Sequence, residues 1–207
     1  MAWREQAARE KRHAYRNWDY WGKPVPGFGD AHARVLVVGL APGAHGSNRT
    51  GRMFTGDASG NFLYAALHRV GFANQPIAHS LSDGLVITDL YISAVCRCAP
   101  PKNRPDRKEI ANCRPFLLAE MEYLHKIEGI VALGKIAFDE VLSNFRRPGH
   151  SAAKFKFEHG GFYQLGNSLP WMIASYHPSQ QNTQTGRLTI EMFDAIWKRV
   201  VGLLKQS

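Results

Sequence analysis

Apolar residues gather in four short runs along the chain, and longer segments rich in polar residues and glycine separate them. The first run, residues 34–40, is continuous and leads directly into a glycine-rich loop. A continuous apolar run of this length is typical of a parallel strand buried on both faces. Three further runs, within residues 85–95, 128–134 and 171–176, predict three more strands.

The segments between these runs show helical spacing. In residues 61–70, Phe62, Ala66 and Val70 fall on one side of a helix. We also expect helices over residues 2–15, 105–125, 135–145 and 188–204, the second of them opened by Pro105 because proline is tolerated in a first helical turn. Residues 18–33 and 146–169 lack a regular period and predict loops and short irregular pieces.

Strands that alternate with helices predict an α/β fold. We expect a three-layer α/β/α sandwich around a short, mostly parallel four-stranded sheet, with residues 1–207 forming a single domain. Ligands of such sheets bind at the carboxyl ends of the strands. Three polar segments follow predicted strands and should form one pocket: "GLAPGAHGSNRTGRMFTGD", "CRCAPPKNRP" and "SYHPSQQNTQTGR".

Composition narrows the class of protein. The chain is 44% hydrophobic, which suffices for a core without disulfides. It contains no apolar run of about 18 residues, and its charged N-terminus lacks the apolar centre of a secretory signal, so we expect a cytoplasmic protein without a membrane span. A net charge of +9 favours a polyanionic partner such as nucleic acid, although a basic surface with no such partner remains an alternative.

The loop after the first strand could hold either a phosphate or a base. A phosphate-binding loop needs a Gly-Lys-Ser/Thr sequence, and "GAHGSNRTG" lacks one. No G-x-G-x-x-G opens a helix either, so we expect neither nucleotide nor magnesium. A glycine-rich connection with no ligand is the remaining alternative for this loop alone.

Taken together, the three polar segments resemble those of the uracil-DNA glycosylase superfamily, most closely its family 5 branch of iron–sulfur enzymes. The resemblance runs from "PVPGFGDAHARVLVVG" to "GRLTIEMF". It implies a monomeric, nucleoid-associated DNA repair enzyme that acts on double- and single-stranded DNA. Such enzymes flip a damaged nucleotide into a pocket. They then hydrolyse its N-glycosidic bond with water, without a lysine Schiff base, and leave an abasic site.

The resemblance assigns catalytic roles to three residues. Asp57 would position or activate water and stabilise the sugar cation, although spacing alone favours an N-cap of the following helix. His177 would donate a hydrogen bond to the departing base, where a lone histidine is more often structural. Asn103 would orient water or the sugar, with a turn residue as its alternative.

Further residues are expected to bind the substrate. Phe54 would stack on the flipped base, if it is not a core residue, and the main chain at Gly39, Leu40 and Ala41 would line the pocket. The loop after His177 would enter the minor groove, where Asn182, Gln180 and Gln181 contact bases or sugars. Arg49, Arg52 and Arg187 are candidate phosphate contacts, each of which could equally be a solvated surface charge.

Two positions differ from the narrowly specific families of this superfamily. Those families carry an acidic residue in the first motif, as in "GQDPYH", where this chain has Ala41. They also read uracil with an asparagine where this chain has Ala94. A pocket without specific hydrogen bonds discriminates weakly between bases. We therefore expect hypoxanthine, xanthine or other modified bases to be removed as well.

The resemblance also implies a 4Fe–4S cluster, for which Cys98 and Cys113 are the matching ligands. The family's other two ligands form a CxxC upstream of the segment resembling "AWRE", which here lies at residues 2–5. A misplaced start, a lost cluster, or an unusual site completed by Cys96 and a histidine are the three explanations, and we favour the first. Cys96 itself fits a buried apolar position.

Two other functions remain open from the sequence. One is a DNA-binding module of the same fold that senses damage without cleaving. The other is a nucleotide-binding hydrolase that uses the glycine-rich loop.

Overall fold

The computed structural model describes residues 2–145 and 155–206, and a six-stranded sheet forms its centre. The strands are β1 (Phe28–Gly29), β2 (Val35–Gly39), β3 (Leu90–Ala94), β4 (Gly129–Leu133), β5 (Phe162–Gln164) and β6 (Trp171–Ser175). Their order is β1-β3-β2-β4-β6-β5. The strands β3, β2, β4 and β6 are parallel, and the outer strands β1 and β5 pair antiparallel.

The predicted four-stranded sheet is therefore corrected to six strands. The four apolar runs each supply one of the parallel strands. The two edge strands are two and three residues long, and residues of β5 are partly exposed, so neither leaves a hydrophobic run in the sequence. The short pairings arise from contact with β3 and β6, which sequence periodicity does not record.

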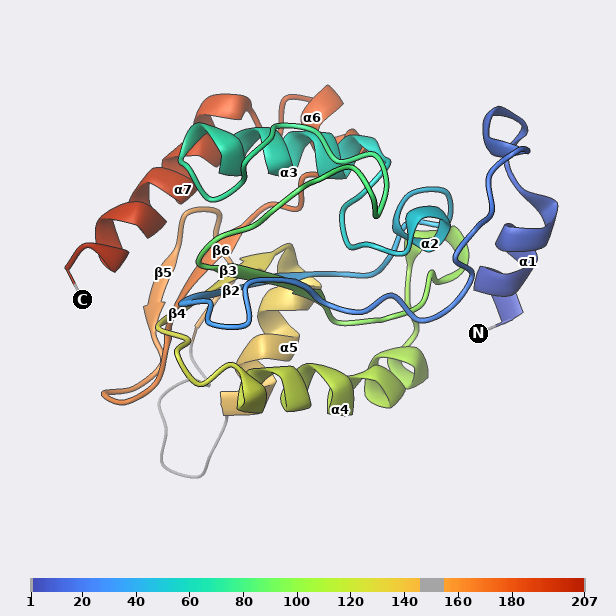
Figure 1. The fold of residues 1–207 in the computed structure, drawn as a ribbon. Coiled ribbons are helices and arrows are strands. Elements are labelled where there is room, and N and C mark those ends of the chain that lie inside the picture. The colour runs from blue at the N-terminus through green and yellow to red at the C-terminus, as the bar shows by residue number, and fades with distance from the viewer. Residues whose placement is uncertain (1, 146–154, 207) are drawn as a thin grey trace.

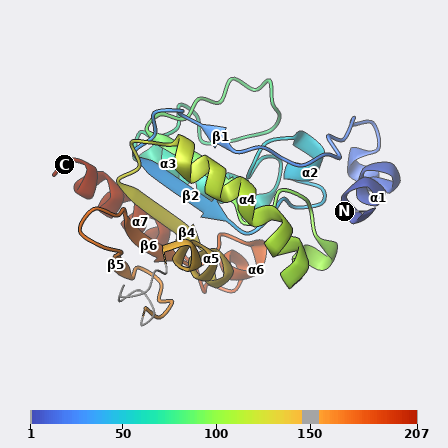
Figure 2. The same ribbon diagram turned by 90° about the horizontal axis from the view of Figure 1, so that it is seen from below.

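Helices cover both faces of the sheet in three layers (Figure 1). The helices α3 (Ala58–Arg69) and α7 (Ile190–Leu204) lie on one face, and α4 (Arg107–Tyr123) and α5 (Lys135–Phe145) on the other. Figure 2 shows the face with α4 and α5. Every residue of β2, β4 and β6 is buried, as expected of central strands covered on both faces. The α/β/α sandwich is confirmed.

Helix boundaries follow local capping. The side chain of Asp106 accepts a hydrogen bond from the N–H of Glu109, and the carboxylate of Glu109 accepts one from the N–H of Asp106. This capping box makes Asp106 the N-cap, so α4 begins at Arg107 and not at Pro105. The helix predicted over residues 2–15 divides into α1 (Ala2–Glu10) and a 3₁₀ turn, His13–Tyr15, because Lys11 has a positive φ of 49°.

Two short helices lie in the polar segments that the sequence predicted as loops: α2 (Ser47–Thr50) and α6 (Gln180–Gln184). Both follow the carboxyl ends of parallel strands, where the polar segments gather. None of the helices in the described part of the chain is long and apolar enough to span a membrane.

Candidate active site

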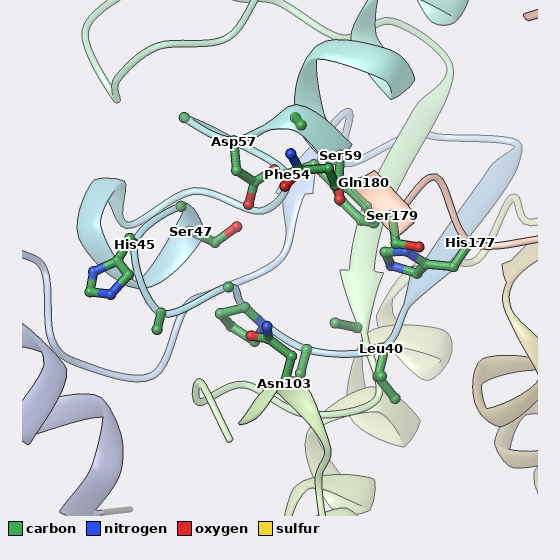
Figure 3. A pocket seen from close by; sticks show the side chains of 18 of the residues that line it. Leu40, His45, Ser47, Phe54, Asp57, Ser59, Asn103, His177, Ser179 and Gln180 are labelled. Atoms are coloured by element: carbon green, nitrogen blue, oxygen red, sulfur yellow. The ribbon is translucent and has the colours of Figure 1, made fainter. Parts of the chain in front are cut away.

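The three polar segments meet at the carboxyl ends of the parallel strands, around one cavity of about 800 Å³ (Figure 3). The segment after β2 contributes Leu40 and Ala41, among others. The segment after β3 contributes Asn103, and the segment after β6 contributes His177. The expectation that these loops form one pocket is confirmed by the fold.

Asp57 caps a helix and faces this cavity at the same time. Its Oδ1 accepts a hydrogen bond of 2.9 Å from the N–H of Gly60 in the first turn of α3. The other oxygen, Oδ2, lies against Gly46, where a Cβ atom would overlap the carboxylate. Desolvation raises the pKa of Asp57, while backbone N–H groups and the charge of Arg49 act against the rise. The two interpretations of Asp57, cap and pocket carboxylate, are therefore compatible.

Phe54 occupies the floor of the site in an unusual backbone conformation. Its φ is +52°, a region that non-glycine residues adopt at a cost. Gly39 makes this position available, because a Cβ atom there would lie 2.7 Å from the Phe54 ring. The Phe54 ring stacks with that of His177, with centroids 5.8 Å apart and planes inclined by 27°. Phe54 is thus held between the end of β2 and the loop after β6.

His177 follows β6 and its backbone is fixed by two neighbours. Its carbonyl accepts a hydrogen bond of 2.8 Å from Nδ2 of Asn182. A Cβ atom at Gly134 would lie 3.3 Å from Cβ of His177, so the loop after β4 packs closely here. Desolvation lowers the pKa of His177 to about 4. The ring is therefore neutral at physiological pH and can donate a hydrogen bond without carrying charge.

Asn103 reaches the cavity from the side opposite Asp57 (Figure 3). It ends a 3₁₀ turn, Pro101–Asn103, in which Lys102 and Asn103 have φ values of +52° and +56°. Asparagine tolerates this left-handed region better than most residues. The exposed turn thus presents a polar side chain to the space between Asp57 and His177.

Comparison with known proteins agrees with this architecture. The family model described as "Uracil DNA glycosylase superfamily" matches residues 26–201. The chain belongs to this superfamily. It is 49% identical to a type-5 uracil-DNA glycosylase of Thermus thermophilus, over 98% of this chain and 91% of the relative. It is 50% identical to one of Mycobacterium leprae (95% and 85% covered) and 46% identical to one of Pyrobaculum aerophilum (89% and 78% covered). The resemblance to the family 5 branch is confirmed.

Most of the other expected substrate contacts line the cavity, and two do not. Leu40, Ala41, Ala94, Gln180 and Gln181 form part of its wall. Gly39 and Asn182 lie outside the lining in the described residues. Gly39 sits beneath the Phe54 ring, and Asn182 uses its amide to hold the carbonyl of His177.

The prediction that Arg49 and Arg52 contact phosphates at the surface is wrong, because both side chains are buried, 4% and 2% exposed. The guanidinium of Arg52 pairs with both oxygens of Asp83, at 2.9 and 2.6 Å. Although burial acts against it, this contact holds the pKa of Asp83 below its ordinary value. Sequence spacing could not show that Asp83, in a distant loop, neutralises Arg52.

Arg49 is enclosed by the N-terminal segment. Its guanidinium lies 3.9 Å from the ring centroid of Tyr15 and 4.1 Å from that of Trp18. It also donates to the carbonyls of His45, at 2.8 Å, and Gly56, at 2.9 Å. Arg49 thereby ties together the two stretches of loop that flank Asp57. Arg187, by contrast, is exposed and lies over the Tyr176 ring at 4.7 Å.

Several cavity residues escaped the sequence reasoning. Arg12, Lys102 and Arg104 are exposed and line the mouth of the cavity. His45 also lines it, and its Nδ1 shares a hydrogen bond of 3.0 Å with the Tyr20 hydroxyl. Desolvation, aided by two neighbouring arginines, lowers the pKa of His45. His45 could have been predicted to line the pocket, because it lies inside the glycine-rich loop that follows a strand. No pattern in the sequence linked Arg12 to the pocket.

The three cysteines line a second cavity of about 250 Å³. Nη1 of Arg4 lies 2.8 Å from Sγ of Cys98, and the N–H of Arg97 donates to Sγ of Cys113. A hydrogen bond from Cys96 lowers the pKa of the Cys113 thiol. A four-thiolate cluster does not fit the residues present, because the sequence holds three cysteines. Within residues 2–145 and 155–206, no group of three or more His, Cys, Asp or Glu is placed to hold a metal ion.

Proposed function

We propose that this protein is a uracil-DNA glycosylase that hydrolyses the N-glycosidic bond of uracil in DNA and leaves an abasic site. One observation carries the proposal. Asp57, after β2, and His177, after β6, face a single cavity in a chain about half identical to type-5 uracil-DNA glycosylases. A carboxylate and a neutral donor on either side of one cavity suit a reaction that separates a sugar cation from a base anion.

The cavity favours an extruded nucleotide as substrate. Enzymes that act on a base within a duplex rotate that nucleotide into a pocket. Phe54, on the cavity floor, offers a flat apolar surface for the base, and the glycines of the first loop allow the backbone to approach it.

Asp57 and His177 then divide the charge of the reaction. The ionised carboxylate of Asp57 stabilises the cationic sugar and, with Asn103 across the cavity, orients the attacking water. The neutral imidazole of His177 donates a hydrogen bond to the departing base, whose negative charge grows as the bond breaks. A positioned donor of this kind contributes about 3 kcal/mol to the transition state. Water alone completes hydrolysis, so the enzyme is monofunctional in this proposal.

The substrate range extends beyond uracil in this proposal. Ala41 and Ala94 both line the cavity, and neither side chain can form a hydrogen bond with a base. Hypoxanthine and xanthine, also products of deamination, are therefore the expected additional substrates. A panel of duplexes with one lesion each tests this: excision of uracil alone would contradict it.

DNA phosphates would contact the mouth of the cavity. Arg12, Lys102 and Arg104 are exposed there, and the exposed Gln180 and Gln181 of α6 also line the cavity. Arg187 is exposed over the ring of Tyr176, the residue before His177. These charges replace the buried Arg49 and Arg52 as candidate phosphate contacts. We expect the protein to act on both double- and single-stranded DNA as a monomer.

The decisive experiment measures excision directly. A labelled duplex with one uracil is incubated with the protein, and alkali then cleaves any abasic site. The proposal predicts strand cleavage that needs neither magnesium nor nucleotide. Binding without cleavage would indicate a non-catalytic module, and nucleotide turnover in place of excision would indicate a hydrolase of another class.

A further inference from the structure

His159, which has no part in the reaction described so far, lies directly against the residue that precedes His177. The N–H of Tyr176 donates a hydrogen bond of 3.1 Å to Nδ1 of His159. The two rings are stacked, with centroids 4.9 Å apart and planes inclined by 11°. The Ser175 hydroxyl lies 3.4 Å from the same Nδ1. His159 thus contacts the chain at the exit of β6.

These contacts determine the protonation state of His159. A backbone N–H can only donate, so Nδ1 must carry a lone pair and the proton of a neutral ring sits on Nε2. Desolvation lowers the pKa of His159 and favours this neutral form, while a backbone hydrogen bond at Met192, on α7, opposes the shift. The ring is therefore a fixed acceptor for Tyr176.

The backbone at this point decides where the His177 ring is directed. β6 ends at Ser175, so the hydrogen bonds of the sheet no longer hold the chain beyond it. Before His177, the N–H of Tyr176 donates a hydrogen bond to His159. After it, the carbonyl of His177 accepts a hydrogen bond from Asn182. We propose that His159 is a positioning residue that sets the orientation of His177 toward the departing base. This inference rests on the proposed role of His177.

A purely structural role for His159 is the competing explanation. The loop that carries His159 has its own attachment to β6, because the N–H of Gly160 donates to Ala174 at 2.8 Å and the N–H of Ala174 donates to Gly161 at 3.0 Å. These bonds do not involve the imidazole. A substitution of the ring can therefore remove the acceptor for Tyr176 while the loop stays attached.

Three substitutions separate positioning from packing. In H159N the amide oxygen takes the place of Nδ1, so the acceptor is kept. In H159Q the oxygen lies one bond further out, and in H159F the ring remains but the acceptor is lost. Each is compared with wild type and H177A in single-turnover excision of uracil from a duplex, with binding to the same DNA and thermal unfolding measured alongside.

We expect H159F and H159Q to slow excision about tenfold to a hundredfold, as small misplacements of a reacting group do, while DNA affinity stays unchanged. H159N should stay within a few fold of wild type. In the H177A background, H159F should add no further loss. In NMR spectra, the amide proton of Tyr176 should shift upfield in H159Q and return in H159N, because the hydrogen bond is lost and restored.

The outcomes distinguish the two proposals. If H177A excises uracil as fast as wild type, the role proposed for His177 fails first. If H177A is slow but H159Q equals H159N in rate, the positioning role of His159 is overturned and the proposed function stands. The comparison of H159Q with H159N decides the matter even if H159F does not fold.

Discussion

The rings of Phe54 and His177 stack 5.8 Å apart, although one follows β2 and the other follows β6. Both strands pair with β4, in parallel, so their carboxyl ends lie at the same edge of the sheet. The contact therefore links the two loops that carry the proposed carboxylate and the proposed donor. The site depends on strand order as much as on the residues themselves.

Replacing Asp57 by Asn should distinguish its role as a helix N-cap from its role in catalysis. Asn and Asp are about equally good N-caps, so α3 should remain intact. Loss of the negative charge should slow excision at least about a hundredfold, the cost typical of removing one group that stabilises a transition state. Single-turnover kinetics and thermal unfolding of D57N check the two halves of this prediction.

The matched control is Thr189→Ala. Thr189 caps α7 through the N–H of Met192 and lies away from the cavity lining. Its removal should lower the free energy of unfolding by about 1 kcal/mol. Excision should be unaffected. Near wild-type excision by D57N would leave Asp57 as a cap alone.

The loss of activity at low pH should result from protonation of Asp57 and not from protonation of His177. With a pKa of about 4, His177 stays neutral from weakly acidic to basic solution. Burial raises the pKa of Asp57, and excision needs its ionised form, so the rate should fall as the pH drops through this raised value. The measurement is the single-turnover rate as a function of pH.

Arg49 offers a test of that assignment. Its charge lowers the pKa of Asp57, so R49Q should move the acidic limb of the pH–rate profile to higher pH. R49K keeps the charge and should leave the limb near its wild-type position. Identical limbs for R49Q and R49K would show that the limb does not report Asp57.

An amide at position 94 should narrow the substrate range. Ala94 is buried at the cavity wall, where Asn could form hydrogen bonds with uracil, and its larger side chain would leave less room for the bicyclic ring of a purine. We expect A94N to lower the ratio of hypoxanthine to uracil kcat/KM by about tenfold or more. An unchanged ratio would mean that other residues set the range of bases.

The basic residues at the cavity mouth should control the salt dependence of DNA binding. Each phosphate contact that is lost should reduce the slope of log affinity against log salt by about 1. R12A, K102A and R104A are the variants to measure by titration. K198A is the control, since Lys198 is exposed on α7 outside the cavity lining. Equal slopes for all four variants would show that DNA phosphates do not bind at the cavity mouth.

The 207-residue chain should not hold a four-thiolate cluster. Its three cysteines supply one thiolate too few, and Arg4 already contacts Cys98. After anaerobic incubation with iron and sulfide, we expect no stable broad visible absorbance. A stable band with four irons per chain would contradict this. The iron–sulfur cluster that the family resemblance implies stays a prediction, and this spectrum tests it.

By itself, the sequence determined the parts of the protein that depend on local pattern. The four apolar runs became the four parallel strands, and α5 has the bounds that its spacing predicted, Lys135–Phe145. The motifs after the strands indicated the superfamily. These features can be predicted because periodicity and strand-end chemistry are properties of neighbouring residues.

Tertiary structure alone decided which charges are buried and which residues meet. Arg49 and Arg52 resemble Arg187 in the sequence, yet two are enclosed and one is exposed. Arg12 reaches the cavity only because the N-terminal segment packs against distant loops. In the same way, β1 and β5 extend the sheet only through their pairing with β3 and β6. Burial and pairing depend on contacts between residues far apart in the chain, and local periodicity carries no record of them.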